Sequence, residues 1–205
     1  MTLRRIRIIL WVVAGLAALA GLVIALRPMP ADAPIASSGS LAEIGGPFTL
    51  TGSDGKAFSS EQLAGKPYAL FFGFTHCPDV CPTTLARLAR LRNALGKGND
   101  SFAIVLVSVD PDRDTPEAMA RYAGLFGTPV IALTGTTAAI ERVKKLYGVY
   151  SAKVPQAGAD YTVDHNATVF LIDQTGRFAA TISPSEGDDA AGAKLDRLVK
   201  DGPAT

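Results

Sequence analysis

The sequence predicts an α/β fold, a sandwich in which helices cover a mostly parallel central sheet. Tyr68–Phe74 and Phe102–Val109 are short, nearly continuous apolar runs, which is typical of strands buried on both faces. Each run is followed by a segment with the marks of a helix. Alternation of strand and helix along the chain favours parallel strands with helices packed against them.

An N-terminal hairpin is expected to open the folded domain. Phe48, Leu50 and Phe58 flank the turn-forming sequence Gly52–Gly55. Glycine, serine and aspartate between two short apolar segments favour a tight reversal of the chain. The buried strand Tyr68–Phe74 then follows.

The later elements are expected from capping residues and apolar segments. Thr115 suits the N-cap of a helix that runs to about Leu125, and Thr136 or Thr137 that of a helix ending near Gly148. The remaining strands are expected at Val130–Leu133, Thr168–Ile172 and Phe178–Ile182, a last helix at Asp188–Lys200, and a long irregular loop at Val149–Val163.

The N-terminal residues 1–27 are expected to form a transmembrane helix that anchors the protein. Ile8 to Leu26 carries no charge, and about 19 residues at about 1.5 Å each span a hydrocarbon core. A cleaved signal peptide is the alternative, since Ala31–Ala33 resembles a small-x-small cleavage site. Arginines before the span favour a cytoplasmic N-terminus. We therefore expect a single-pass protein of a bacterial plasma membrane, whose domain faces the periplasm or the cell exterior.

Residues 28–44 are rich in proline, alanine and serine and are expected to be a flexible tether. Residues 45–205 then form one domain of ordinary size. The whole chain has 20 Lys and Arg against 19 Asp and Glu, so no basic excess points to nucleic acid. Phosphate-binding and hydrolase motifs such as a P-loop or G-x-S-x-G are also absent from the sequence.

The two cysteines of the chain, Cys77 and Cys81, lie between the first buried strand and the helix after it. Pro82 suits the first turn of that helix, which continues with leucines at spacings of three and four residues. The positive end of a helix dipole stabilises a thiolate, so these thiols are expected to be reactive or metal-binding. A structural disulfide is the alternative, but closing so short a loop removes little chain entropy.

Three segments resemble, in order, the signatures of the Sco/SenC family of copper-binding proteins that help to assemble cytochrome c oxidase. They are Gly73–Leu85 (GFTHCPDVCPTTL), Val107–Glu117 and Val163–Asp173. The resemblance covers roughly residues 45–200. It implies a thioredoxin-like three-layer sandwich, a membrane anchor, and a copper ion held by Cys77, Cys81 and His165. The implied role is delivery of that copper to the binuclear copper centre of oxidase subunit II.

Ligand chemistry agrees with that implied site. Thiolates favour Cu(I) or zinc, and imidazole suits copper. His76 and His165 are the only histidines, and His76 directly precedes Cys77, so we expect its side chain to point away from the face that the cysteines share. A fourth donor for Cu(II) could be Asp79 or Asp164, which are also explained as ordinary solvated carboxylates.

Two functions remain open. The first is a copper metallochaperone, which is not an enzyme; the second is a thiol–disulfide oxidoreductase that reduces the cysteines of the oxidase copper site. The C-x-x-x-C spacing, where thioredoxins have C-x-x-C, and the histidine favour the first. Asn166-Ala167 also stand where thioredoxin-type enzymes place a cis-proline.

The acidic run Asp110–Pro116 is explained as a strand end and a helix cap, although Arg113 and Asp114 could face a partner.

Overall fold

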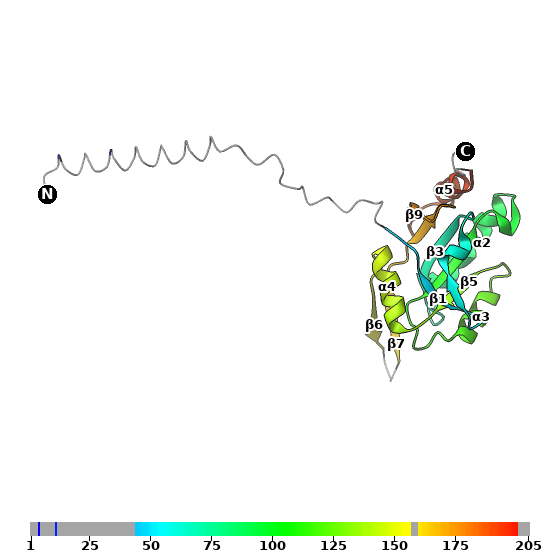
Figure 1. Cartoon of the computed structure of the whole chain (residues 1–205), viewed down its shortest axis with the longest axis horizontal. Coiled ribbons are helices and arrows are strands. Elements are labelled where there is room, and N and C mark those ends of the chain that lie inside the picture. The colour runs from blue at the N-terminus through cyan, green and yellow to red at the C-terminus, as the bar shows by residue number, and fades with distance from the viewer. Residues whose placement is uncertain (1–3, 5–10, 12–43, 157–159, 201–205) are drawn as a thin grey trace. The chain divides into compact units, whose positions relative to one another are not determined.

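The computed structural model describes Arg4, Trp11, residues 44–156 and residues 160–200 (Figure 1). The chain divides into two units, Met1–Gly39 and Ser40–Thr205, and nearly all described residues belong to the second. Apart from Arg4 and Trp11, the expected transmembrane helix lies outside the described residues, and so does the expected tether apart from Ile44. Within the part of the chain that is described, no helix is both long enough and apolar enough to cross a membrane.

The central sheet has seven strands in the order β2-β1-β5-β4-β3-β8-β9. Their bounds are β1 Thr49–Gly52, β2 Ala57–Ser59, β3 Tyr68–Gly73, β4 Ala103–Ser108, β5 Ile131–Thr134, β8 Val169–Ile172 and β9 Phe178–Ile182. Only the β3–β4 and β4–β5 pairs are parallel, and the other four pairs of these strands are antiparallel. The prediction of a mostly parallel sheet is therefore wrong. The sheet is mixed, because the hairpins β1–β2 and β8–β9 extend both edges, and each hairpin joins the three parallel strands in the antiparallel direction, through the pairs β1–β5 and β3–β8.

Four α-helices accompany the sheet in the described domain, at or close to the positions expected from the sequence. They are α2 Val80–Ala94, α3 Pro116–Gly124, α4 Thr137–Tyr147 and α5 Asp188–Lys200, with short 3₁₀ turns at Ser60–Leu63 and Gly98–Asp100. Thr115 caps α3 through the Ala118 N–H, and Thr136 caps α4 through the Ala139 N–H. Gly148 ends α4 in a left-handed conformation with φ of 63°, which suits glycine.

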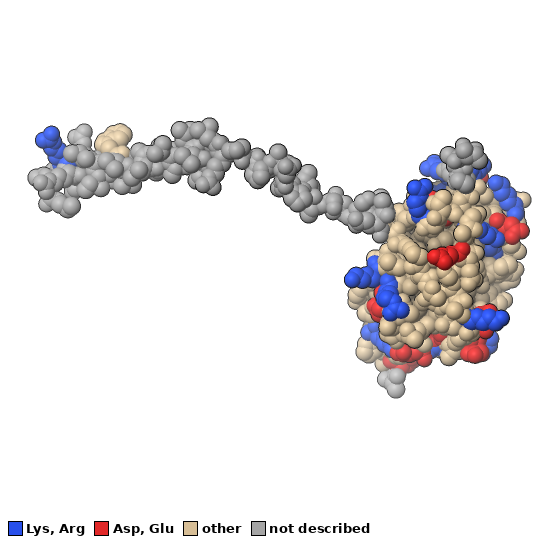
Figure 2. Space-filling model, in the orientation of Figure 1, with Lys and Arg blue, Asp and Glu red and all other residues tan. Residues whose placement is uncertain are grey.

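The hydrophobic core lies around the two central strands. Every residue of β3 and β4 is buried, so both faces of the sheet are covered there, as a layered α/β sandwich requires. Helices α2 and α5 pack against each other, whereas α3 lies beside β5 and α4 beside β1. On the face that Figure 2 shows, lysine and arginine side chains are interspersed with acidic ones.

The segment expected to be an irregular loop contains a second, two-stranded sheet. Strands β6 (Ser151–Pro155) and β7 (Tyr161–His165) pair antiparallel, with Ser151 opposite His165. This sheet is separate from the central one, and Figure 1 shows the hairpin projecting from the rest of the domain. The prediction of an irregular loop is therefore wrong. Most side chains of β6 and β7 are exposed or half-buried, so the sequence lacks the alternation of apolar and polar residues by which a strand is recognised.

Candidate metal centre

The two cysteines lie where β3 leads into α2, as the sequence predicted. Cys81 is fully buried in the first turn of α2, and Cys77 is half-buried in the preceding loop. The Cys81 backbone N–H donates a hydrogen bond to the Cys77 Sγ at 3.4 Å. The sulfur of Cys77 thus accepts one of the N–H groups that a helix leaves unpaired at its N-terminus, where negative charge is stabilised. Both thiols are free.

Gly73, the last residue of β3, makes room for the buried sulfur. A Cβ at this position would lie 2.9 Å from the Cys81 Sγ and 2.9 Å from the Phe71 Cε1. Both separations are shorter than a normal contact. Sequence reasoning missed this role, although a glycine within an apolar strand is a known signal of close approach.

We expect Gly73→Ala to destabilise the fold by about 1–3 kcal/mol, the usual cost of overpacking a core. The added methyl group would also displace the Cys81 sulfur. Chemical denaturation would measure the stability, and the alkylation rate of Cys81, followed by mass spectrometry, would measure its exposure. The matched control is Gly192→Ala in α5, where the new Cβ meets only Leu91 Cδ2 at 3.8 Å. Wild-type stability and alkylation in Gly73→Ala would contradict the assigned role.

The imidazole of His165 lies against Cys81. Its Nε2 is 3.6 Å from the Cys81 Sγ, and its Nδ1 is 2.9 Å from the Asn166 carbonyl oxygen. A carbonyl oxygen only accepts, so Nδ1 carries the proton and Nε2 presents its lone pair to the sulfur. The rings of Phe71 and Phe74 pack edge-on against the imidazole, which fixes its orientation.

The Cys81–His165 pair has the spacing of two donors to one ion. Bond lengths of about 2.3 Å to sulfur and about 2.0 Å to nitrogen, at a trigonal angle, place the donors about 3.7 Å apart. Among the described residues, no three Cys, His, Asp or Glu side chains converge closely enough as they stand to form a complete metal site. Cys77, four residues before Cys81, is the candidate for a third donor, because its sulfur already accepts a hydrogen bond from the Cys81 N–H.

Burial sets the protonation of this pair. It raises the pKa of the Cys81 thiol well above its ordinary value, and it lowers the pKa of His165 below its ordinary value of 6.5. In each case the charged form is disfavoured by the loss of water. At neutral pH the imidazole is therefore neutral, with a lone pair free to coordinate, and a metal ion at Cys81 must displace a proton.

The other candidate donors lie elsewhere or point to solvent. His76 is exposed, and its Nδ1 lies 3.1 Å from the Thr75 Oγ1. Asp79 is exposed and accepts a hydrogen bond from the Thr83 hydroxyl. Asp164 is also exposed, on the opposite face of β7 from its neighbour His165, because side chains alternate along a strand. The structure brings none of these three onto the Cys81–His165 pair.

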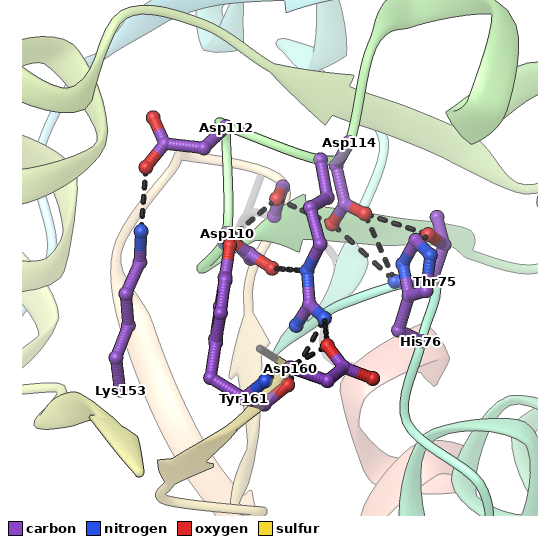
Figure 3. A network of polar contacts seen from close by, with 10 residues as sticks. Thr75, His76, Asp110, Asp112, Asp114, Lys153, Asp160 and Tyr161 are labelled. Atoms are coloured by element: carbon purple, nitrogen blue, oxygen red, sulfur yellow. Dashed lines mark hydrogen bonds and ion pairs between the residues drawn. The ribbon is translucent and has the colours of Figure 1, made fainter. Parts of the chain in front are cut away.

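Asp114 is hydrogen-bonded to Thr75, in the loop that leads to the cysteines (Figure 3). It is fully buried, and it accepts hydrogen bonds from the Ser108 hydroxyl and from both the backbone N–H and the hydroxyl of Thr75. Burial raises the pKa of Asp114, and these hydrogen bonds oppose the shift. The expectation that Asp114 could face a partner is therefore wrong. In a run of acidic residues, the sequence does not show which aspartate is buried and which is exposed.

Two free thiols at a strand–helix junction, with an imidazole against one of them, define a thiol site in a mixed α/β domain. Such a site is suited to a soft metal ion or to exchange with a disulfide. The family model SCO1/SenC matches residues 36–200. The chain thus belongs to the SCO1/SenC family.

Individual relatives agree with this membership. The yeast protein "Protein SCO2, mitochondrial" is 42% identical over 160 residues, which are 77% of this chain and 53% of the yeast protein. The chain therefore spans about half the length of that relative. The copper-bound structure of Bradyrhizobium japonicum ScoI is 44% identical with a TM-score of 0.69, and covers 76% of this chain and 99% of that one. BsSco, described as a member of the Sco family of cytochrome c oxidase assembly proteins with a disulfide switch, is 25% identical with a TM-score of 0.62, covering 79% and 96%.

Proposed function

We propose that this protein is a copper metallochaperone that binds one copper ion through Cys77, Cys81 and His165. The observation that carries the proposal is the 3.6 Å approach of the His165 Nε2, unprotonated, to the Cys81 Sγ. Two sulfurs and one imidazole form a soft donor set that favours Cu(I). The copper-bound ScoI structure and the oxidase-assembly description of BsSco support the same assignment.

The acceptor that we propose is the binuclear copper centre of cytochrome c oxidase subunit II. The donors are mounted on different parts of the fold, with Cys81 on α2 in the core and His165 on the separate β6–β7 hairpin. Copper is cargo here, so it must leave as well as bind. Stepwise exchange, in which thiolates of the acceptor replace the three donors one at a time, avoids the release of a free copper ion.

We further propose that residues 8–26 anchor the domain to a bacterial plasma membrane, with the domain facing the periplasm or the cell exterior.

A titration of the reduced domain with Cu(I) against a competing chelator tests this function, beside an assay of disulfide reduction. We expect one tightly bound Cu(I) per chain and negligible turnover. Weak copper binding with rapid turnover would favour the thiol–disulfide oxidoreductase instead. The geometry keeps that alternative open, because both thiols are free and Cys77 is only half-buried, as attack on a partner's disulfide requires.

Copper affinity is expected to rise with pH by about tenfold per unit between about pH 7 and pH 8, for each thiol proton that Cu(I) displaces. The raised pKa of Cys81 keeps its thiol protonated at neutral pH, so at least this proton is released. The pKa of His165 is lowered below its ordinary value of 6.5, so at pH 7 and above its imidazole is neutral and adds no proton competition. The variant His165→Ala, measured by the same chelator competition, should bind more weakly with the same slope. An affinity that does not change with pH would contradict this protonation of Cys81.

A further inference from the structure

The hairpin that carries His165 needs contacts of its own to hold it in place. Its two strands pair with each other and with no strand of the seven-stranded sheet among the described residues. At its base, the Tyr150 N–H donates to Asn166 Oδ1 and the Asn166 N–H donates to the Tyr150 carbonyl oxygen. One buried side chain, Val163, joins the core. The position of His165 over Cys81 therefore depends on side chains that bridge the hairpin to the domain.

Arg113, in the turn between β4 and α3, is the side chain that makes most of these bridges. Its Nη1 donates to the Asp160 carboxylate at 3.1 Å and to the Tyr161 carbonyl oxygen at 3.0 Å. Its guanidinium carbon also lies 3.8 Å from the centre of the Tyr161 ring. A planar, forked cation can make all of these contacts at once, which a lysine cannot. Arg113 thus holds the start of β7, the strand that ends at His165.

The turn that carries Arg113 is itself fixed to the core (Figure 3). The fully buried Asp110 accepts from the Arg113 Nε at 2.5 Å and from the Tyr161 hydroxyl at 2.8 Å. Four residues later, Asp114 accepts the Thr75 hydrogen bonds described above. One short turn therefore joins the histidine hairpin to the loop that begins two residues before Cys77.

Phe74 completes the connection between Arg113 and His165. The guanidinium carbon of Arg113 lies 5.9 Å from the centre of the Phe74 ring, and the His165 ring packs edge-on against the same ring at 5.8 Å. Displacement of Arg113 would therefore free both the hairpin and an aromatic side chain that orients the imidazole.

We propose that Arg113 is a positioning residue that sets the approach of His165 to the cysteine pair, through Tyr161, Asp160 and Phe74. The predicted effect of Arg113 on copper affinity rests on the proposed function, because His165 is a copper donor only if that function is correct. Arg113 touches no metal donor itself. It acts by holding the β6–β7 hairpin against the rest of the domain.

A double-mutant cycle tests the proposal. We expect Arg113→Met to weaken Cu(I) affinity by about 10-fold to 100-fold, the range found when a group that orients a metal ligand is lost. In the His165→Ala background the same substitution should weaken affinity by no more than about twofold, because there is no longer an imidazole to position. Equal losses in both backgrounds would overturn the proposal, since a general structural effect would not depend on His165.

Arg87→Met is the matched control. The Arg87 side chain is 15% exposed against 18% for Arg113. It likewise bridges two parts of the fold, through Asp188 and the Ser183 and Glu186 carbonyl oxygens, but it forms no hydrogen bond or ion pair with the described residues of the histidine hairpin. Arg87→Met should lower stability without a change in copper affinity that depends on His165. If Arg113→Met does not fold because Asp110 is left as a buried charge, the double variant Arg113→Met with Asp110→Asn removes both charges.

Hydrogen exchange of the metal-free protein provides a second readout, which remains valid if the wild-type chain binds no copper. Backbone amides of Tyr161–His165 should exchange faster in Arg113→Met than in wild type, and at the wild-type rate in Arg87→Met. Unchanged exchange in Arg113→Met would overturn the positioning role. Failure of the wild type to bind copper would overturn the proposed function alone.

Discussion

Replacing both cysteines with serine, in Cys77→Ser with Cys81→Ser, is expected to lower Cu(I) affinity by more than about 1,000-fold, because a serine hydroxyl is neither soft nor ionised at neutral pH. The two sulfurs are the only cysteine sulfurs in the chain, so no other thiol can substitute for them. Chelator competition with the reduced domain measures the effect. Tight, stoichiometric Cu(I) binding by the double serine variant would show that the metal site lies elsewhere.

The fold of this variant needs a separate check, because Cys81 is fully buried and a buried hydroxyl without a partner costs about 1–3 kcal/mol. Circular dichroism and thermal unfolding would confirm that the domain remains folded. The variant Cys77→Ala with Cys81→Ala avoids the buried hydroxyl and should bind copper equally poorly. Prior oxidation of the wild-type thiols to a disulfide should also prevent Cu(I) binding, since copper and the bond compete for the same sulfurs.

His165→Ala is expected to weaken Cu(I) binding by at least about 100-fold, the upper end of the loss caused by removing a group that only orients a ligand. The two thiols remain in this variant, so residual binding should persist with a lower coordination number. The change in sulfur-to-copper absorption of the Cu(II) form would report the loss of the nitrogen donor, and chelator competition would report the affinity.

The other histidine of the chain supplies the control for that experiment. His76 directly precedes Cys77 and is exposed, and its ring is hydrogen-bonded to the Thr75 hydroxyl. We expect His76→Ala to change copper affinity by no more than about twofold, because its ring does not contact Cys81 or His165 in the described structure. A loss as large as that of His165→Ala would mean that the wrong histidine had been assigned.

Local signals in the sequence predicted much of the fold. The N-caps Thr115 and Thr136 and the terminal Gly148 depend only on residues within one helical turn, and so does the placement of Cys81 at the start of α2. The resemblance of Val163–Asp173 to a family segment, rather than any spacing, pointed to His165. Its contact with Cys81 joins residues 84 positions apart in the sequence.

By itself, the sequence determined the two thiols, their place at a helix start, the apolar strands and the N-terminal hairpin, because periodicity and capping act between near neighbours. The tertiary structure alone decided the antiparallel pairing of β1 with β5 and of β3 with β8, the β6–β7 hairpin, and the burial of Asp110 and Asp114. It also decided that Gly73 makes room for Cys81 and that Arg113 bridges to the histidine hairpin. These features arise where distant segments pack together, and the free energy of such contacts depends on the whole fold rather than on any local pattern.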